Sequence, residues 1–402
     1  MINTTKIDEL IQNEIAAKRL GGAQIYLYQN GQILMDKEYG STRKDDIFRI
    51  YSMSKIVTMI GVMLLIQDGL LNLKDPVSKY LPSFAERVVY DASGNKVKSQ
   101  LEMKISDLLN MTSGLGYPLE NLTDCDRDWI EFEKKQSELC KSDNNHSMID
   151  FCNMAGTIPG AFEPGTRWKY GASADILGAI IEVVSGKPFD AFLKERIFAP
   201  LEMEDTEFYL PKDKSGRIAK MYTRDENTGT VSELPTIMSD ERDITCFTLP
   251  DTAVIRRVRP FLISGGAGLY CTTKDYAKIL HLLLNGGEYK GKHLIDKSTY
   301  ETIITPQLPE EVTKTICSDN AAGFALAGYT YSNLIRILLS PDTAKDYGYC
   351  GSEGEFGWEG LPGNYCLVDS KEKIVLLFMI QIKEGPSVPF RAELRKLIYS
   401  KY

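Results

Sequence analysis

Hydrophobic and polar positions alternate near the amino terminus, and short apolar runs follow one another near the carboxyl terminus; both patterns predict β-strands. Ala23–Gly40 contains two alternating runs joined at Asn30-Gly31. This dipeptide predicts a tight β-hairpin, because both central positions of such a turn need positive φ. Asn364–Asp369 and Lys373–Ile382 predict two further strands linked by a short turn. We expect the four strands to lie in one antiparallel sheet.

Between and around these strands, apolar residues recur at the spacing of α-helices. The clearest helical segments are Ile50–Gly69, which is apolar almost throughout, Ser173–Gly186 and Thr273–Gly287. Shorter amphipathic helices are expected within residues 1–20 and 389–402.

Strands at both ends with helices between them predict an α/β (α+β) fold built from a discontinuous domain. We expect residues 1–75 and 260–402 to form the domain with the antiparallel sheet, flanked by helices. Residues 76–259 are helical and loop-rich, and we expect them to form an inserted, mainly helical domain.

The overall composition excludes some classes of function. The chain has 402 residues and a formal net charge of −8, which leaves no excess of positive charge for nucleic-acid binding. The longest apolar run, Ile56–Ile66, is too short to span a bilayer, and the amino terminus lacks the pattern of a signal peptide. We therefore expect a cytoplasmic protein without a membrane partner; the sequence does not indicate its oligomeric state.

Cysteine and histidine are distributed in a way that offers no metal site. The eight cysteines form no C-x-x-C pair, so they are expected to be free thiols. The three histidines, His146, His281 and His293, do not lie at ligand spacing from one another. We predict no metal and no other cofactor, and an activated serine would need a base other than imidazole.

A lysine lies at the start of the apolar helix, in the string YSMSK (Tyr51–Lys55). Helical positions three apart share a face, so Ser52 and Lys55 point the same way whereas Ser54 points elsewhere. If Ser52 begins the helix, the positive end of the helix dipole stabilises its alkoxide. Burial would lower the pKa of Lys55, and a neutral amine beside a serine is a proton acceptor.

Two other strings offer complementary chemistry. Tyr170 precedes a short loop that opens the helix Ser173–Gly186, and a tyrosine near a neutral lysine can relay protons. The glycine-rich string EFGWEGLPGNYCLVD (Glu355–Asp369) enters a strand, where a backbone N–H can approach a substrate closely.

The combination and order of these strings resemble the penicillin-recognising serine hydrolases, which share S-x-x-K with two further motifs. The resemblance extends to LLNMTSGL (Leu108–Leu115) and to the long stretches Phe162–Phe208 and Gly265–Gly287. Within this group the chain is most similar to the family VIII carboxylesterases, which are close to class C β-lactamases. The resemblance implies a beta-lactamase/transpeptidase-like fold.

The resemblance implies catalytic residues at the positions of this chain that match the motifs of the family. Ser52 would be the acyl-accepting nucleophile, Lys55 its general base and Tyr170 the proton relay. The backbone N–H groups of Ser52 and Leu361 would form the oxyanion hole.

The motif at Tyr170 and the motif at Trp358 both differ from those of the β-lactamases. Trp358-Glu359-Gly360 stands at the substrate-binding position of K-T-G, and Ala172 replaces the asparagine of the tyrosine motif. Glu359 clusters with Glu353 and Glu355, and like charges would disfavour a bound carboxylate. Trp358 would instead offer a flat apolar wall to an ester.

These features predict a serine hydrolase that acts through an acyl-enzyme on Ser52, with a small-molecule ester as substrate. A D-amino-acid amidase or peptidase, a weak β-lactamase and an acyltransferase of the same fold are the alternatives, as is a non-catalytic binding relative. The charged segment Asn121–Ser147 is expected near the site entrance.

Overall fold

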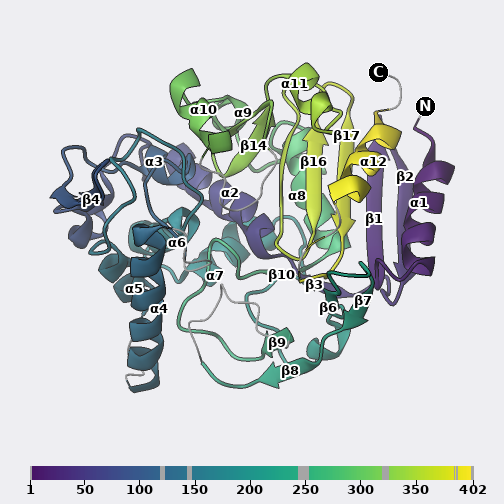
Figure 1. Ribbon diagram of the computed structural model, residues 1–402, viewed down its shortest axis with the longest axis horizontal. Helices are drawn as coiled ribbons and strands as arrows, with labels where there is room; N and C mark the ends of the chain where they lie inside the picture. The colour runs from purple at the N-terminus through teal and green to yellow at the C-terminus, as the bar shows by residue number, and fades with distance from the viewer. Residues whose placement is uncertain are drawn as a thin grey trace.

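A seven-stranded antiparallel sheet contains strands from both ends of the chain (Figure 1). The computed structural model describes residues 2–117, 123–142, 147–242, 253–318, 326–383, 385 and 388–399. The strands of the sheet are, in spatial order, β13 (Tyr329–Ser332), β14 (Ile335–Leu338), β15 (Phe356–Glu359), β16 (Tyr365–Asp369), β17 (Ile374–Met379), β1 (Gly22–Gln29) and β2 (Gln32–Gly40).

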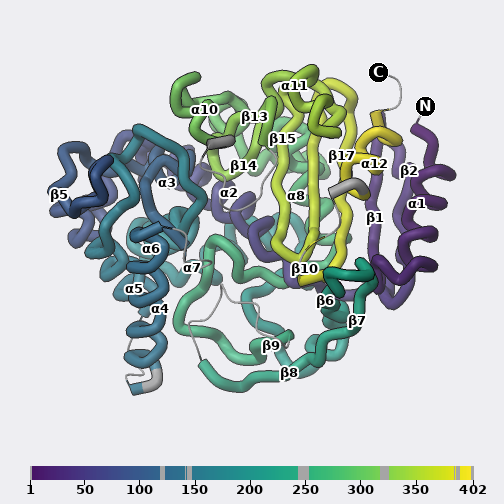
Figure 2. The backbone as a smooth tube through the Cα atoms, in the orientation of Figure 1, coloured from purple at the N-terminus to yellow at the C-terminus, as the bar shows by residue number. Residues whose placement is uncertain are grey.

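The predicted terminal hairpins are confirmed, and they meet as expected. Asn30 and Gly31 have φ angles of 49° and 88° in the turn between β1 and β2. β1 pairs with β17, with Gln24 opposite Met379, and Figure 2 shows these early and late segments side by side.

Helices cover both faces of the sheet. The helices are α1 (Thr4–Ala16), α2 (Ser54–Gln67), α3 (Ile105–Leu109), α4 (Asp124–Ser142), α5 (Met148–Ala155), α6 (Ser173–Ser185), α7 (Phe189–Leu193), α8 (Thr273–Leu284), α9 (Lys297–Ile304), α10 (Glu310–Ser318), α11 (Pro341–Asp346) and α12 (Val388–Ile398). On β1, Ile25 belongs to the apolar core beneath α1 and α12, whereas Tyr26 points to α8 and lies 2.7 Å from His281. Alternate side chains therefore meet different helices, and both faces of the central strands are apolar.

Short strands form small two-stranded sheets outside the main one. These are β3 (Ile47–Arg49) with β10 (Tyr270–Thr272), β4 (Val88–Tyr90) with β5 (Lys96–Lys98), β6 (Tyr222–Arg224) with β7 (Val231–Glu233), β8 (Thr236–Ser239) with β9 (Ala253–Arg256), and β11 (Glu288–Tyr289) with β12 (Lys292–His293). The β3–β10 pair matters for function because β3 leads into the YSMSK string.

Helix α2 is buried on all sides between the sheet and the helices α6, α7 and α9 (Figure 1). Its residues from Ser54 to Leu65 are all buried, as the nearly continuous apolar sequence requires. Gly61 allows close packing here, because a Cβ atom at this position would lie 3.0 Å from Leu193. The helix starts later than predicted: Tyr51–Met53 form a 3₁₀ turn, and α2 begins at Ser54.

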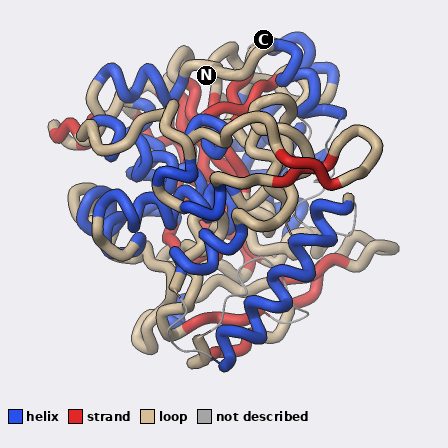
Figure 3. The backbone as a smooth tube through the Cα atoms, turned by 90° about the vertical axis from the view of Figure 1, so that its left-hand side faces the viewer, coloured by secondary structure: helices blue, strands red, loops and turns tan. Residues whose placement is uncertain are grey.

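The helices α3 to α7 lie beside this core, and α4 runs along the outside (Figure 3). The charged segment Asn121–Ser147 forms α4 over most of its length, while residues 121–122 and 143–146 lie outside the described residues, His146 among them. The domain boundaries at 75/76 and 259/260 stay predictions.

No helix in the described ranges is long and apolar enough to cross a membrane. Six of the cysteines carry free thiols in the described residues, in line with the prediction, and five of these six are buried. The Cys246 residue and the Cys317 side chain lie outside the described part of the chain.

Candidate active site

The candidate nucleophile lies in a tightly held turn between β3 and α2. The backbone carbonyl of Arg49 accepts hydrogen bonds from Asn364 Nδ2 at 2.8 Å and from Gln381 Nε2 at 3.0 Å. Tyr51, which directly precedes Ser52, has a φ angle of 44°, in the left-handed region that non-glycine residues rarely adopt. Such strained residues cluster at functional sites, where the surrounding structure holds them in place.

Ser52 and Lys55 are in contact, as the sequence predicts. Lys55 Nζ lies 3.1 Å from Ser52 Oγ and donates to the Gly266 carbonyl at 2.7 Å. Residues three apart eclipse one another in a 3₁₀ turn, so the turn brings the two side chains together. Ser54 points elsewhere and accepts a hydrogen bond from the Leu269 N–H at 3.1 Å.

Lys55 is fully buried, and its environment makes it a base near neutral pH. Burial lowers the pKa of Lys55 to about 7, while the charge of Asp175 acts in the opposite direction. The Lys55 Nζ also lies 5.3 Å and 4.7 Å from the ring centroids of Tyr117 and Tyr170. A neutral amine here uses N–H groups for the Gly266 carbonyl and leaves its lone pair for the hydroxyl of Ser52.

Tyr170 completes the set that the structure brings together. Burial raises the pKa of Tyr170, and hydrogen bonds with Ser52 and Trp358 oppose that rise. The phenol is therefore protonated at neutral pH, whereas a substantial fraction of Lys55 is then the neutral amine that can act as a base. Two neighbouring groups with well-separated pKa values suit an acid and a base of one reaction. The loop fits closely, since a Cβ atom on Gly171 would lie 1.9 Å from the Leu115 carbonyl.

The Trp358 ring is not the open wall that the sequence suggested. Its side chain is fully buried, with ring centroids 5.6 Å from Tyr170 and 4.8 Å from Tyr331. The indole Nε1–H donates to the hydroxyl oxygen of Tyr170 at 3.3 Å. Trp358 thus acts on the phenol through this hydrogen bond.

The prediction of clustered negative charge in this loop is also wrong. Glu355 is fully buried and pairs with Arg395 of α12, and Glu359 pairs with Arg391 of the same helix. Only Glu353 of the three acids is exposed. Arginine neutralises the other two, so the loop does not repel an anion as expected.

The end of β15 lies directly against the segment that leads to Ser52. A Cβ atom on Gly360 would lie 2.4 Å from the carbonyl oxygen of Ile50, so only glycine fits. Leu361 follows with 46% of its surface exposed. The backbone groups of Ser52 and Leu361 therefore belong to two segments in contact, and their oxyanion role stays a prediction.

A buried carboxylate lies behind the lysine. Asp175, in the first turn of α6, accepts hydrogen bonds from Ser264 Oγ at 2.6 Å, from the Gly266 N–H at 3.1 Å and from the Tyr117 hydroxyl at 3.3 Å. Burial raises the pKa of Asp175, and these hydrogen bonds together with the charge of Lys55 oppose the rise. Asp175 thus holds the Gly266 peptide, whose carbonyl orients the Lys55 amine.

Comparison with known proteins identifies the family of the chain. The profile of the family described as Beta-lactamase matches residues 7–400. The chain belongs to this family. It is 25% identical to Esterase EstB of Burkholderia gladioli, over 98% of this chain and 95% of that protein. It is 23% identical to the N-acetylmuramyl-L-alanine amidase of Bacillus subtilis strain 168, over 95% of this chain and 82% of that protein.

Solved structures show the same fold. EstCE1, a hydrolase with promiscuous acyltransferase activity, superposes with a TM-score of 0.74 at 19% identity, covering 98% of each chain. Membership of the beta-lactamase family confirms the beta-lactamase/transpeptidase-like fold. The family and these relatives make the protein a hydrolase or an acyl-transferring enzyme.

The sequence analysis did not identify the residues that surround Lys55 in this site. Asp175 was a visible signal, because it is an acid in the first turn of the otherwise mostly apolar string SADILGAIIEVVSG, which holds only one other acid, Glu182. Gly266 was visible as part of the GGAG string, and a Cβ atom there would lie 2.5 Å from the Tyr117 hydroxyl. No spacing rule indicated that these segments meet behind α2.

The Asp175→Asn variant is expected to shift the acid limb of the pH profile of kcat/KM to lower pH. Asp175 raises the pKa of Lys55, so the loss of its charge lowers that pKa below about 7. Tyr117→Phe removes a hydrogen bond but no charge at neutral pH, and serves as the control. An unmoved acid limb in Asp175→Asn would contradict the electrostatic role.

The Trp358→Phe variant is expected to lower kcat about five- to tenfold with little change in KM, because it loses the one hydrogen bond that the indole donates to Tyr170. Phenylalanine keeps an aromatic ring beside Tyr331 but has no N–H for Tyr170. Steady-state kinetics on one ester measure the change. A rise in KM alone would instead indicate direct substrate contact.

Proposed function

We propose that the protein is a serine esterase that hydrolyses small-molecule esters through an acyl-enzyme on Ser52. The observation that carries this proposal is the 3.1 Å contact between Ser52 Oγ and the buried Lys55 Nζ, whose pKa is lowered to about 7. A neutral amine at hydrogen-bond distance is the base that a serine nucleophile needs.

In the acylation step, Ser52 Oγ attacks the ester carbonyl while Lys55 accepts the hydroxyl proton. The N–H groups of Ser52 and Leu361 would stabilise the oxyanion of the tetrahedral intermediate. The carbon–oxygen bond of the ester then breaks, and the Tyr170 phenol donates its proton to the departing alcohol. The ammonium of Lys55 returns a proton to the Tyr170 oxygen, which leaves the amine neutral again.

In the deacylation step, a water molecule attacks the acyl-enzyme from the same side. Tyr170 and Lys55 together accept a proton from this water, and the Ser52 oxygen leaves with a proton from the same pair. The products are the free acid and the regenerated serine. Both steps use the same acid and base, as microscopic reversibility requires.

Three positions favour an ester over a β-lactam as substrate. Ala172 offers no side-chain amide for an acylamino group. The Trp358 indole replaces the usual lysine, and Glu359 is paired with Arg391. This site therefore lacks the polar groups that hold the two ends of a penicillin in the related β-lactamases.

Acyl transfer to an acceptor other than water is the second candidate, because EstCE1 combines hydrolysis with acyltransferase activity. Added alcohols would give transfer products if the acceptor site binds them. The D-amino-acid amidase alternative loses its main support, since the acids expected to receive a substrate ammonium are paired with arginines. D-aminoacyl amides assayed beside p-nitrophenyl esters test it directly.

Covalent labelling tests the proposal. A fluorophosphonate probe is expected to add one phosphonyl group to the wild-type chain, and peptide mapping is expected to place it on Ser52. The reaction breaks the P–F bond, forms an O–P bond to Ser52 and releases fluoride.

Ser54→Ala is the matched control for Ser52→Ala. Ser54 lies two residues away and points to the Leu269 N–H, so its variant is expected to keep the labelling. Ser52→Ala is expected to lose both the labelling and the esterase activity. Full esterase activity in Ser52→Ala would overturn the proposed function.

A further inference from the structure

The two halves of the expected oxyanion hole come from distant segments of the chain. Ser52 lies just after β3, and Leu361 lies just after β15. Two N–H groups stabilise an oxyanion well only if each lies about 2.7–3.1 Å from it, and a misplacement of about 1 Å can cost about 100-fold in rate. The protein therefore needs a group that sets the distance between these two segments.

Asn364 forms hydrogen bonds with both segments. It is fully buried, and its Nδ2 donates to the carbonyl of Arg49, the last residue of β3, at 2.8 Å. Its backbone carbonyl accepts a hydrogen bond at 2.8 Å from the N–H of Gly360, which directly precedes Leu361. Asn364 thus joins the end of β3, which leads into Ser52, to the segment that carries Leu361.

A tight turn fixes Leu361 relative to Asn364. The Gly363 N–H donates to the Gly360 carbonyl at 2.8 Å, so residues 360–363 form a β-turn that contains Leu361. A Cβ atom on Gly360 would lie 3.3 Å from the Cβ atom of Asn364, which leaves little space between the turn and the asparagine. A shift of Asn364 is therefore expected to move the Leu361 N–H.

The side chain of Asn364 is itself held in place. Its Oδ1 accepts a hydrogen bond at 3.1 Å from the N–H of Ile380, which directly follows β17. An amide carries both a donor and an acceptor, so one planar group joins the Arg49 carbonyl to the end of β17. Leucine has as many side-chain heavy atoms as asparagine but can form neither hydrogen bond.

A second amide holds Arg49 as well. Gln381 Nε2 donates to the Arg49 carbonyl at 3.0 Å, and Gln381 Oε1 accepts from the Arg49 N–H at 3.2 Å. The end of β3 therefore keeps hydrogen bonds when Asn364 is replaced. We expect a replacement to shift the two oxyanion segments relative to one another rather than to release β3.

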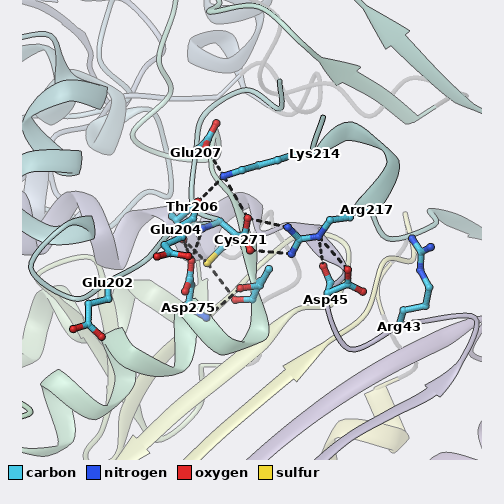
Figure 4. A network of polar contacts seen from close by, with 12 residues as sticks. Arg43, Asp45, Glu202, Glu204, Thr206, Glu207, Lys214, Arg217, Cys271 and Asp275 are labelled. Carbon is cyan, nitrogen blue, oxygen red and sulfur yellow. Dashed lines mark hydrogen bonds and ion pairs between the residues drawn. The ribbon is translucent and has the colours of Figure 1, made fainter. Parts of the chain in front are cut away.

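The start of β3 is held by a separate network (Figure 4). Arg217 donates to the carbonyl of Asp45 at 2.9 Å, shortly before β3, and pairs with Asp205 at 2.9 Å. Arg217 thus supports the start of the strand, whereas Asn364 acts at its end. This difference makes Arg217→Gln a control for a purely structural loss.

We propose that Asn364 is a positioning residue that sets the distance between the backbone N–H groups of Ser52 and Leu361. It acts through the backbone of the two segments and does not touch the substrate. The assignment deepens the proposed esterase function and rests on it. Because the oxyanion forms only as the carbonyl is attacked, the loss of Asn364 is expected to lower kcat rather than to raise KM.

Replacement of Asn364 tests the positioning role. Asn364→Leu is expected to lower kcat toward p-nitrophenyl butyrate about 10- to 100-fold, with KM changed less than about threefold. Asn364→Ala is the second variant, because the space that it leaves can admit a water for the Arg49 carbonyl and the Ile380 N–H. Its kcat is expected to fall as well. A rise in KM with an unchanged kcat would overturn the proposal.

A pair of substrates separates positioning from a loss of folded protein. p-Nitrophenyl butyrate and its O-thiono analogue differ only in the atom that enters the oxyanion hole, and sulfur accepts hydrogen bonds more weakly than oxygen. Wild type is expected to prefer the oxygen ester in kcat/KM, and both Asn364 variants are expected to reduce this preference about tenfold. The ratio is internal to each variant, so partial unfolding does not affect it. Arg217→Gln is expected to keep the wild-type ratio.

The outcomes separate this proposal from that of the esterase. Ester hydrolysis that depends on Ser52, with equal ratios in wild type and both Asn364 variants, overturns the positioning role alone. Labelling of Ser52 by a fluorophosphonate without hydrolysis of any ester overturns the esterase, and the labelling rate then tests Asn364. This rate is expected to fall at least about fivefold in Asn364→Leu, because the phosphoryl oxygen occupies the oxyanion hole. An equal rate overturns the positioning role, and full activity in Ser52→Ala overturns both proposals.

Discussion

The Lys55→Met variant is expected to lose about 10⁴-fold in kcat/KM toward p-nitrophenyl butyrate, the upper end of what a general base supplies. Methionine fills a similar volume but has no lone pair that can accept the proton of Ser52. The loss should lie in the chemical step, because Lys55 contacts Ser52 Oγ at 3.1 Å and lies wholly inside the protein. Removing a buried amine also relieves its desolvation, so the variant is expected to fold.

The pH dependence of the wild type provides an independent check on the same residue. Neutral Lys55 is the active form, so kcat/KM is expected to fall tenfold per pH unit below its lowered pKa of about 7. Lys274→Met, an exposed lysine on α8, is the control and is expected to match wild type. A flat wild-type profile between about pH 5 and 8, or nearly full activity in Lys55→Met, would refute the assignment of Lys55 as the base.

The Glu355→Ala variant is expected to lower the free energy of unfolding by about 3–5 kcal/mol, the cost of leaving a buried charge without its partner. Glu355 and Arg395 both have side chains with 0% exposure, and the Glu355 Oε1 accepts from Arg395 Nη1 at 3.0 Å. Tyr399 of the carboxyl-terminal segment also donates to Glu355, at 3.4 Å. The urea midpoint measures the loss.

Two further variants make this test specific. Lys396 lies on the same helix in an exposed pair with Glu393 at 3.8 Å, so Lys396→Ala is expected to change the stability by less than about 0.5 kcal/mol. The double variant Glu355→Met/Arg395→Met removes both charges and is expected to be more stable than Glu355→Ala. Equal stability of Glu355→Ala and wild type would show that the pair does not hold α12 to the sheet.

The periodic features of the sequence predicted most of the fold. The Asn30-Gly31 turn and its alternating runs predicted β1 and β2, and the two apolar runs near the carboxyl terminus predicted β16 and β17, whose residues are buried on both faces of the sheet. The spacing in YSMSK predicted the contact of Ser52 with Lys55 because this contact is local. The start of α2 was predicted too early, because the residues Tyr51–Met53 form a 3₁₀ turn and the α-helix begins at Ser54.

The features of the site that the sequence analysis missed depend on contacts between distant segments. The burial of Trp358 depends on Tyr170 and Tyr331, which come from other parts of the chain. Glu355, which precedes β15, and Glu359, which ends it, form ion pairs only because α12 packs against the sheet. Charge patterns along one segment do not reveal a partner that follows 30 or more residues later.

The pairing of β1 with β17 has a consequence for how this enzyme is synthesised. Ser52 and Lys55 leave the ribosome before β17, Leu361 and the arginines of α12 do. A nascent chain therefore exposes the edge of β1 that later pairs with β17 until β17 has been synthesised, and such edges bind other chains. Messages with premature stop codons before β15 would yield products that carry the nucleophile and its base but neither Trp358 nor Gly360, and we expect them to aggregate without activity.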